Sequence, residues 1–447
     1  MERYEDMSLE ELLRHDDFAC GCGKRHAAGI ERVLIGSGAL RELPALIRGF
    51  GCARPFVLAD RSTDEAAGRR VRALLREAGL ECSFCVMPEA RPAPDERTVG
   101  GAVMHFDRRC DLVLGVGSGV VNDTGKILAG MTGLPYVVAA TAPSMDGYAS
   151  ATSSMERDGL KVSLDSAAAR AIVGDLDVLC AAPERMLLSG VGDMVAKYVS
   201  LCEWRLSTIV TDEYYCPVVA GVVENALKKC VSAAPGLRER RPEAVRAVME
   251  GLVAAGMAMH YAGVSRPASG MEHYFSHIWD MRALAFGTPS DLHGIQCGVG
   301  TLLSLRCYEF ARRLTPDRGR ARAAAARFSP GDWNARLRAF IGPGAEAMIE
   351  GERREGKYDP ARREARAERI VERWPELCAV MDTLPPLEEV RALLAGIGAP
   401  TTPEELGISR EDARTTFTMT KDIRDKYVLS RLLWDLGELD RAAAECF

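Results

Sequence analysis

From about Ile30 to Val178 the sequence alternates short apolar runs with amphipathic stretches. Strands that are nearly continuous in Val, Leu and Ala, and that are separated by helices, are typical of a parallel sheet covered on both faces. The segment therefore predicts an α/β fold with a parallel sheet. We expect strands at 54–60, 81–88, 111–119 and 134–143, and a helix at 64–79.

After about Pro183 the pattern changes, because apolar residues recur at helical spacing and β-branched runs almost vanish. We therefore expect two domains: an α/β domain at 1–180, followed by an all-helical domain at 181–447. The stretch 312–374 is rich in Arg, Ala and Glu. Because its acids balance its bases, we interpret it as a solvated helical hairpin rather than as a basic surface for a partner.

Composition narrows the class of protein. The 447 residues suffice for a large core, and a net charge of −6 argues against nucleic acid as a partner. No apolar run approaches the roughly 18 residues that a membrane span needs. Fourteen cysteines without regular spacing, and an acidic amphipathic start, indicate reduced thiols in a cytoplasmic protein. Cys20 and Cys22 lack a second cysteine pair nearby, so we interpret FACGCGKRH as a loop.

Three of the seven histidines lie in one short window. His273 and His277 are four residues apart, a spacing that places both side chains on one face of a helix, and His293 follows in the next segment. Asp193, in an otherwise apolar helical run, is the candidate acid. An acid with two or three imidazoles suits Zn, Fe or Ni with an open position for substrate. This constellation indicates a metal-dependent enzyme, although a lone Asp after Gly is usually a helix N-cap.

A glycine-rich turn, GVGSGVVNDTGK at 115–126, follows an expected strand and begins a helix. Glycines there let the backbone approach a pyrophosphate at the helix N-terminus, but the spacing is not G-x-G-x-x-G. Asp60, at the end of an earlier strand, is placed to bind ribose hydroxyls, which favours NAD over NADP, or it is only a helix cap. The hydroxyl-rich segment 141–155 follows another strand and is a candidate ligand-binding loop, against the alternative of a turn that bonds its own backbone.

These motifs, together with GVGDMVAK, SGMEHYFSH, LHG and the C-terminal TKDIRDKYVLSRLLWDLG, resemble those of the sn-glycerol-1-phosphate dehydrogenases. That family belongs to the iron-containing alcohol dehydrogenase and dehydroquinate synthase-like superfamily. The resemblance covers most of the chain. It implies an N-terminal Rossmann-like domain that binds NAD and a C-terminal helical domain that binds the metal and the substrate. It also implies NAD(P)-linked interconversion of dihydroxyacetone phosphate and sn-glycerol 1-phosphate, with one divalent metal ion (Zn, Ni or Fe).

The resemblance also implies roles for individual residues. Asp193, His273 and His293 correspond to the metal ligands, and Asp146, Asp193 and His277 to substrate contacts, with Asp193 and His277 as the catalytic pair. The cofactor contacts correspond to Asp60, Gly117, Ser118, Gly119, Val120, Val121, Asn122, Asp123, Thr141, Ser144 and Ser150.

Three expectations remain open at this point. Arg424 and Lys426 are candidates for binding the substrate phosphate, or they belong to a solvated helix face. A homo-oligomer without a membrane span is expected. The rival activities are another metal-dependent polyol or alcohol dehydrogenase and a dehydroquinate synthase-like lyase or cyclase. A nucleotide-binding regulatory protein is a weaker rival, since the acid and histidine set is intact.

Overall fold

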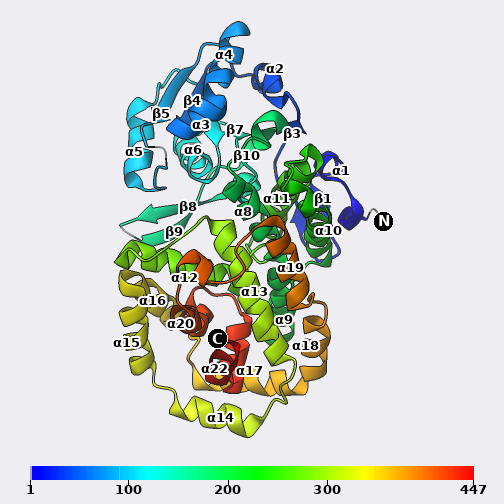
Figure 1. Cartoon of the computed structure of the whole chain (residues 1–447), viewed down its shortest axis with the longest axis vertical. Helices are drawn as coiled ribbons and strands as arrows, with labels where there is room; N and C mark the ends of the chain where they lie inside the picture. The colour runs from blue at the N-terminus through cyan, green and yellow to red at the C-terminus, as the bar shows by residue number, and fades with distance from the viewer. Residues whose placement is uncertain (1–2, 90, 159) are drawn as a thin grey trace. The chain divides into compact units, whose positions relative to one another are not determined.

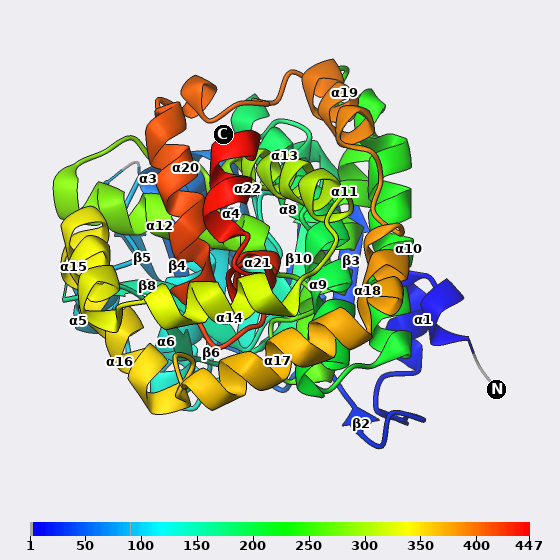
Figure 2. The same ribbon diagram turned by 90° about the horizontal axis from the view of Figure 1, so that it is seen from below.

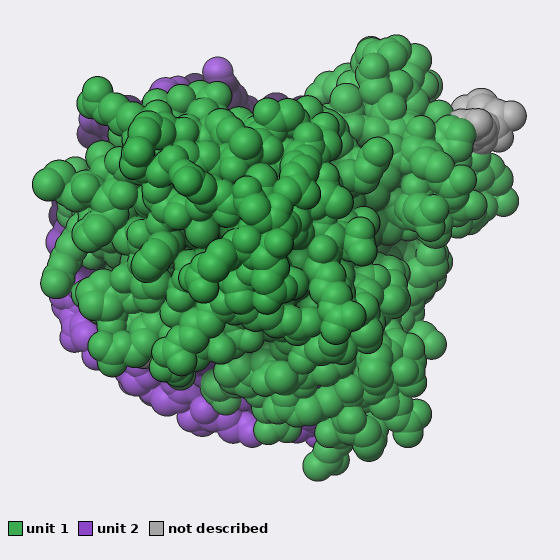
Figure 3. Space-filling view, turned by 90° about the horizontal axis from the view of Figure 1, so that it is seen from above, with its two compact units in different colours: residues 1–194, 218–264 green, residues 195–217, 265–447 purple. Residues whose placement is uncertain are grey.

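The computed structural model describes residues 3–89, 91–158 and 160–447. They group into two compact units, coloured in Figure 3. Unit 1 comprises residues 1–194 and 218–264, and unit 2 comprises residues 195–217 and 265–447. Each compact unit combines two separate stretches of the chain, whereas the expected domains, 1–180 and 181–447, are continuous in sequence. The expected division into domains therefore stays a prediction.

Unit 1 contains a six-stranded sheet in the order β3-β10-β7-β6-β4-β5, and every neighbouring pair runs parallel (Figure 1). The four expected strands and the α/β fold are confirmed, while the two strands at one edge, β3 and β10, were not among those named. The strand bounds are β3 Arg32–Gly36, β4 Pro55–Asp60, β5 Ser83–Met87, β6 Leu112–Gly117, β7 Tyr136–Ala140 and β10 Ala169–Asp175.

The sheet has a topological switch point between β4 and β6. From β4 the chain first adds β5 on one side and then returns to add β6 on the other side. In open α/β sheets, ligands bind outside the carboxyl ends of the strands at such a point. The carboxyl ends of β4, β6 and β7, which are neighbours in the sheet, are therefore the edge where a ligand is expected.

The core of unit 1 lies between the sheet and two helices, α2 (Leu43–Gly49) and α4 (Arg69–Glu77). Alternate strand residues, such as Val57 and Ala59 of β4, face these helices in one apolar cluster. α6 (Gly119–Thr132) packs on the other face, where Tyr136 lies against Gly125. The sheet is thus covered on both faces, as its apolar strands require.

Unit 1 also holds two antiparallel ribbons that the sequence analysis did not predict. β8 (Thr152–Arg157) pairs with β9 (Leu160–Asp165), so the expected loop at 141–155 ends where β8 begins. β1 (Phe18–Ala19) pairs with β2 (Arg25–His26), so the expected loop around Cys20 is the turn of a hairpin. The other helical segments of unit 1 are η1 Tyr4–Asp6, α1 Leu9–Arg14, η2 Ala39–Glu42, α3 Arg61–Thr63, η3 Asp64–Gly68, α5 Glu96–His105, η4 Gly147–Ala149, α7 Leu176–Leu179, α8 Glu184–Val195, α10 Pro217–Ala233, η5 Ala234–Leu237 and α11 Pro242–Ala262.

The regular secondary structure among the described residues of unit 2 is helical, as the periodicity predicts. The apolar run of helical spacing that begins at Glu184 forms two helices, α8 and α9, with Ala196 between them. The helices of unit 2 are α9 Lys197–Thr211, α12 Met271–Phe286, α13 His293–Ala311, α14 Arg318–Arg327, α15 Pro330–Ile341, η6 Gly342–Gly344, α16 Ala345–Glu355, α17 Pro360–Glu372, α18 Trp374–Met381, α19 Leu387–Ile397, η7 Glu404–Leu406, α20 Arg410–Met419, η8 Thr420–Asp422, α21 Leu429–Leu436 and α22 Leu439–Cys446.

The Arg/Ala-rich stretch is not a single hairpin. It forms α14 to α17, with α14 and α17 side by side (Figure 2). It is not wholly solvated either, because Trp333 of α15 donates a hydrogen bond from Nε1 to Asp422 Oδ2 at 2.6 Å inside the unit. Arg431 lies 3.3 Å from the other oxygen of that buried carboxylate. Among the described residues, no helix is both long enough and apolar enough to span a bilayer.

Candidate functional site

The carboxyl edge of the sheet brings together three of the predicted cofactor-binding segments. Asp60 ends β4, Gly117 ends β6, and Thr141 follows β7 directly. A Cβ on Gly117 would lie 2.5 Å from the Cβ of Val121, so only glycine lets α6 begin this close to β6. Ser118, the N-cap of α6, makes no side-chain hydrogen bond to the first turn, and residues 118–120 are half-buried. Such a helix N-terminus favours an anionic ligand.

Asp60 is the N-cap of α3, so the helix-cap alternative is confirmed. Its Oδ1 accepts a hydrogen bond from the Thr63 backbone N–H at 2.8 Å, and the Thr63 hydroxyl accepts one from the Asp60 N–H at 3.0 Å. Burial raises the pKa of the Asp60 carboxyl, while its hydrogen bonds with Thr63 act in the opposite direction. A ribose contact by this side chain stays a prediction.

A buried lysine that the sequence analysis missed connects the helix after β6 to the loop after β7. Lys126 is fully buried, and its Nζ lies 3.1 Å from Oδ1 of Asp123, one turn earlier on α6. The same ammonium donates hydrogen bonds to the Gly147 carbonyl at 3.1 Å and to the Ser150 hydroxyl at 3.2 Å. Asn122 Nδ2 also donates to Gly147, at 3.2 Å. Asn122, Asp123 and Ser150 are therefore assembled into one polar cluster, for which the i, i+3 spacing of Asp123 and Lys126 was the available signal.

The loop after β7 packs closely on α8. The Thr141 N–H donates to the Gly117 carbonyl at 3.1 Å, and the Ser189 hydroxyl of α8 donates to the Ser144 carbonyl at 2.8 Å. A side chain on Gly190 would collide with the Pro143 carbonyl oxygen. This close approach brings the loop next to the helix that carries the predicted acid.

Asp193 is fully buried in the interior of α8, so it is not an N-cap. Its Oδ2 accepts a hydrogen bond from the Asp146 backbone N–H at 2.9 Å. Asp146 itself is half-buried at the N-cap of η4. Unit 1 thus brings together Asp146 and Asp193, which the sequence analysis had assigned to substrate and metal.

Unit 2 brings the three predicted histidines together. His273 and His277 lie one turn apart on α12, and His293 is the first residue of α13. The ring centroids of His273 and His293 are 5.0 Å apart, and those of His277 and His293 are 5.9 Å apart. Residues 287–292 form the short connection from α12 to α13, which brings His293 back beside the two histidines of α12.

Two of these imidazoles are oriented by hydrogen bonds at Nδ1. His273 Nδ1 lies 2.8 Å from Oε1 of Glu272, and His293 Nδ1 lies 3.0 Å from the Ser276 hydroxyl. Gln296 donates to that hydroxyl at 3.1 Å. Histidines that bind metals characteristically use one ring nitrogen for the ion and the other for such a partner. The arrangement fits imidazole ligands that coordinate through Nε2.

Cys297 is a candidate ligand that the sequence analysis missed. Its Sγ lies 3.6 Å from Nε2 of His293, one turn earlier on α13. Ligand atoms of His273, His293 and Cys297 all lie within 4.8 Å of one another, close enough to share an ion. The i, i+4 spacing of His293 and Cys297 on an expected helix was a signal for this proximity.

The segment before α12 is held by two buried lysine side chains. Lys426 Nζ donates to the carbonyls of Ser265 and Ser269 at 3.1 and 2.7 Å, and Lys197 Nζ donates to that of Ala268 at 3.1 Å. Lys426 is buried between η8 and α21, so the expectation of a solvated helix face is wrong for it. Its Nζ supports the loop that leads to His273. The half-buried Arg424 keeps its prediction as a phosphate contact.

Two buried carboxyls of unit 2, those of Glu203 and Glu272, lie at the start of α12. Burial and the nearby Glu272 raise the pKa of Glu203 to about 8, although its carboxyl accepts hydrogen bonds from the Met271 and Leu429 N–H groups at 2.8 and 2.9 Å. These hydrogen bonds fix the first residue of α12 and the first residue of α21. The start of the histidine-bearing helix is therefore anchored from both α9 and the C-terminal region.

Comparison with known proteins places these elements in a family. Residues 34–183 match the family model for iron-containing alcohol dehydrogenase. The chain is 33% identical over 294 residues to glycerol-1-phosphate dehydrogenase NAD(P)+ of Halalkalibacterium halodurans, covering 65% of this chain and 74% of that relative. It is 30% identical over 393 residues to the enzyme of the same name from Geobacillus stearothermophilus, covering 87% and 88%. The chain belongs to the glycerol-1-phosphate dehydrogenase family.

Solved structures agree on the fold of this family member. Glycerol dehydrogenase from Schizosaccharomyces pombe superposes with a TM-score of 0.57 at 16% identity, covering 93% of this chain and 90% of that chain. A 1,3-propanediol oxidoreductase gives a TM-score of 0.58 at 16% identity, covering 94% and 98%. The family assignment makes the chain an oxidoreductase and confirms the recognised resemblance.

Proposed function

We propose that the protein interconverts dihydroxyacetone phosphate and sn-glycerol 1-phosphate with NAD or NADP and one divalent metal ion. The observation that supports this most strongly is the pair His273 and His293, oriented at Nδ1 by Glu272 and Ser276 in a chain whose relatives at 30–33% identity bear that enzyme name. The switch-point edge of the sheet supports the dinucleotide, because that is where open α/β sheets bind such ligands.

The dinucleotide has residues to receive each of its parts. The N-terminus of α6 at residues 117–123 would hold the pyrophosphate through backbone N–H groups. Asp60 would accept hydrogen bonds from ribose hydroxyls, which favours NAD. Thr141, Ser144 and Ser150 would position the nicotinamide end. When bound, the dinucleotide supplies the hydride acceptor or donor.

Asp193, His273 and His293 would hold the metal ion together. Carboxylate and imidazole donors suit Zn, Ni or Fe, and a set of three protein ligands leaves a position for substrate. When bound, the ion supplies a Lewis acid for the negative charge that develops on the substrate oxygen. Cys297 is the rival third ligand, since its thiol already lies beside His293.

His277 would transfer the proton to or from the substrate, and Asp146 would orient the substrate. The ordinary pKa of imidazole lies near neutrality, so His277 suits a proton relay to or from a substrate oxygen. Its ring lies 5.9 Å from that of His293 by centroids, beside the candidate metal ligands. Arg424 would contribute positive charge for the substrate phosphate.

The activity is tested by reducing dihydroxyacetone phosphate with NADH and NADPH and resolving the two glycerol phosphate enantiomers formed. Formation of sn-glycerol 1-phosphate is expected, with oxidation of one reduced dinucleotide for each product molecule. Comparable turnover of unphosphorylated glycerol would instead favour a polyol dehydrogenase. Product formation without net change in the dinucleotide would favour a lyase or cyclase.

The ligand set is tested by removing and restoring metal. Chelated protein should lose activity and regain it with a single added divalent ion, whereas full activity without metal would refute the Lewis-acid role. His273→Ala and Asp193→Asn should lose bound metal and turnover while staying folded. Cys297→Ser should keep both if Asp193 is the third ligand, and should lose the metal if the thiol is. The exposed His105→Ala and Glu184→Gln are matched controls.

A further inference from the structure

The β1–β2 hairpin near the N-terminus brings two cysteines and a histidine to one point. The Cys20 N–H donates to the Lys24 carbonyl at 3.0 Å, and the Gly23 N–H donates to the Cys20 carbonyl at 3.1 Å. Gly23 has φ of +86°, a left-handed conformation that favours glycine and closes the tight turn. The turn thereby folds Cys22 back beside the strand that ends in His26.

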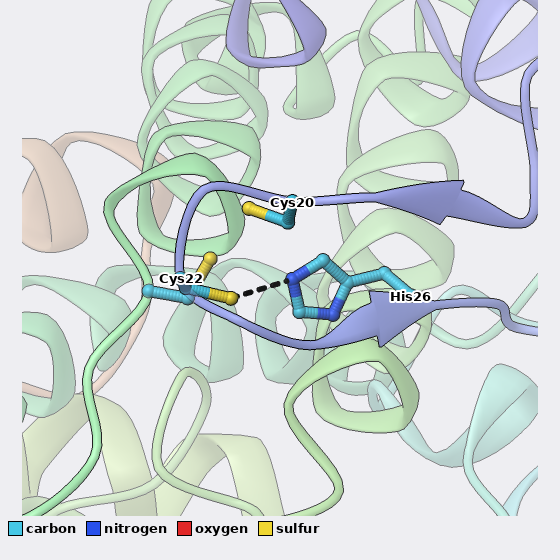
Figure 4. Close-up of side chains that lie close together, drawn as sticks. Cys20, Cys22 and His26 are labelled. Carbon is cyan, nitrogen blue, oxygen red and sulfur yellow. Dashed lines mark hydrogen bonds between the residues drawn. The ribbon is translucent and has the colours of Figure 1, made fainter.

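The ligand atoms of this cluster are close enough to share one ion. Cys22 Sγ lies 3.3 Å from His26 Nε2, and the ligand atoms of Cys20, Cys22 and His26 all lie within 4.8 Å of one another. Figure 4 shows both cysteine side chains on the side of the hairpin that faces the imidazole. A metal bound to thiolates and an imidazole, at about 2.3 and 2.0–2.1 Å, brings ligand atoms to separations of this order.

The tautomer of His26 is fixed in the form that binds metals. The ring is fully buried, and its Nδ1 lies 2.8 Å from the Tyr261 carbonyl oxygen. A carbonyl only accepts hydrogen bonds, so Nδ1 carries the proton and Nε2 of the neutral ring presents a lone pair towards Cys22. A backbone carbonyl behind a histidine ligand is a recurrent feature of protein metal sites.

The hairpin is held in place independently of any ion. Lys24 Nζ donates to the Ala262 carbonyl at 3.2 Å, at the C-terminal end of α11. Asp16 accepts hydrogen bonds from the N–H groups of Ala28 and Gly29, each at 2.9 Å. Phe18 packs against the His26 ring with centroids 5.2 Å apart. A site on such a supported turn needs little reorganisation to bind.

We infer that Cys20, Cys22 and His26 bind a second metal ion, a thiophilic divalent cation of the Zn²⁺ class, with a structural role. None of these residues belongs to the dinucleotide edge or to the proposed catalytic set, so this inference does not depend on the proposed function. On binding, the two S–H bonds break, two metal–thiolate bonds form, and two protons pass to solvent. A tetrahedral ion takes its fourth ligand from outside these three residues.

Two thiolates and a neutral imidazole favour Zn²⁺ over Mg²⁺ or Ca²⁺, which prefer oxygen ligands. The ion would link the N-terminal hairpin to the end of α11, because His26 is bonded to Tyr261 through its other nitrogen. The sequence alone did not indicate this site, because no second cysteine pair lies near Cys20 and Cys22. The missing donor was a histidine, whose support comes from a residue 235 positions away.

The first experiment measures metal content in the full-length protein. After loading with Zn²⁺ and gel filtration, Cys20→Ser/Cys22→Ser should contain one equivalent less than wild type, and His273→Ala should independently lack the other equivalent. Cys82→Ser and Cys180→Ser, half-buried cysteines of the same unit, are the matched controls and should retain both. Wild-type zinc content in the double variant would overturn the inference.

The second experiment replaces zinc by Co²⁺ and records the thiolate-to-cobalt charge-transfer band in a Cys297→Ser background. A band that persists there and disappears in Cys20→Ser/Cys22→Ser is expected. Absence of the band from the Cys297→Ser background, or its survival in the combined variant, refutes the site. If the double variant fails to fold, anomalous diffraction from the zinc-loaded wild type decides, because a peak bounded by Cys20, Cys22 and His26 supports the site and its absence refutes it.

Discussion

His273 Nδ1 and Glu272 Oε1, on adjacent residues, lie 2.8 Å apart, and the same carboxylate oxygen accepts the Gly270 N–H at 2.7 Å. This carboxylate orients the candidate ligand and raises its basicity. Glu272→Gln keeps an acceptor oxygen but removes the charge. We expect metal affinity to fall about 10–100-fold, the usual effect of removing such a partner. Competition with a chromogenic chelator measures it, with the exposed Glu411→Gln of α20 as control. Unchanged affinity would show that His273 is not a ligand.

Lys126→Met should destabilise unit 1. The substitution keeps the length of the side chain but leaves the Asp123 carboxylate without its buried cation and the Gly147 carbonyl without this donor. Breaking a buried ion pair in this way costs about 3–5 kcal/mol. Urea unfolding measures the free energy, and Lys228→Met, exposed on α10, should stay within about 0.5 kcal/mol of wild type. If Lys126→Met lowered the free energy of unfolding by no more than this control, the stabilising role of Lys126 would be refuted.

Two glycines of α6 should respond oppositely to alanine. A Cβ at Gly125 would lie 2.6 Å from Cε2 of Tyr136, so Gly125→Ala should cost about 1–3 kcal/mol through overpacking. Gly130 is exposed, and a Cβ there would meet only ordinary contact at 3.5 Å. Gly130→Ala should therefore stabilise the protein by up to about 1 kcal/mol through helix propensity. Equal effects in thermal or denaturant unfolding would contradict the close packing of Tyr136.

The raised pKa of Glu203 predicts that the folded protein loses stability as the pH rises. Its pKa rises from 4.5 to about 8 on folding, so the folded state binds this proton more tightly than the unfolded state. The resulting stabilisation is complete below about pH 4.5 and disappears as pH rises to about 8, with a slope of at most about 1.4 kcal/mol per pH unit. Glu203→Gln should flatten the difference between pH 5 and pH 8 in denaturant unfolding. A variant with the wild-type pH profile would show that Glu203 is ionised in the folded protein at both pH values.

The parts of the fold that can be predicted from the sequence are those that depend on local periodicity. The strand ending at Asp60 and the turn at Gly117 follow from apolar runs and glycines in one short segment. β3 and β10 were not named, and the ribbon of β8 and β9 lies in a hydroxyl-rich stretch that is also typical of loops. The break at Ala196 interrupts a run whose apolar spacing is continuous through two helices.

The candidate site also contains some residues that the sequence indicates and others that only the tertiary structure shows. Asp193 and His273 were found from residue type and helical spacing. The groups that orient the candidate ligands were not found, because their roles depend on tertiary contacts. The carbonyl of Tyr261 has no sequence signature as the partner of His26, and the buried ammonium of Lys126 resembles any other helical lysine. Cys297 was also missed, although its i, i+4 spacing from His293 was visible in the sequence.

The loop from Ser265 to Gly270 is bonded by lysines at positions 197 and 426, which come from opposite ends of unit 2. Bringing two residues that are so far apart in the sequence to one loop closes a long stretch of chain, which costs conformational entropy and slows folding. We therefore expect the segment before the histidine-bearing helix to become ordered late in the folding of unit 2, after the local helices have formed.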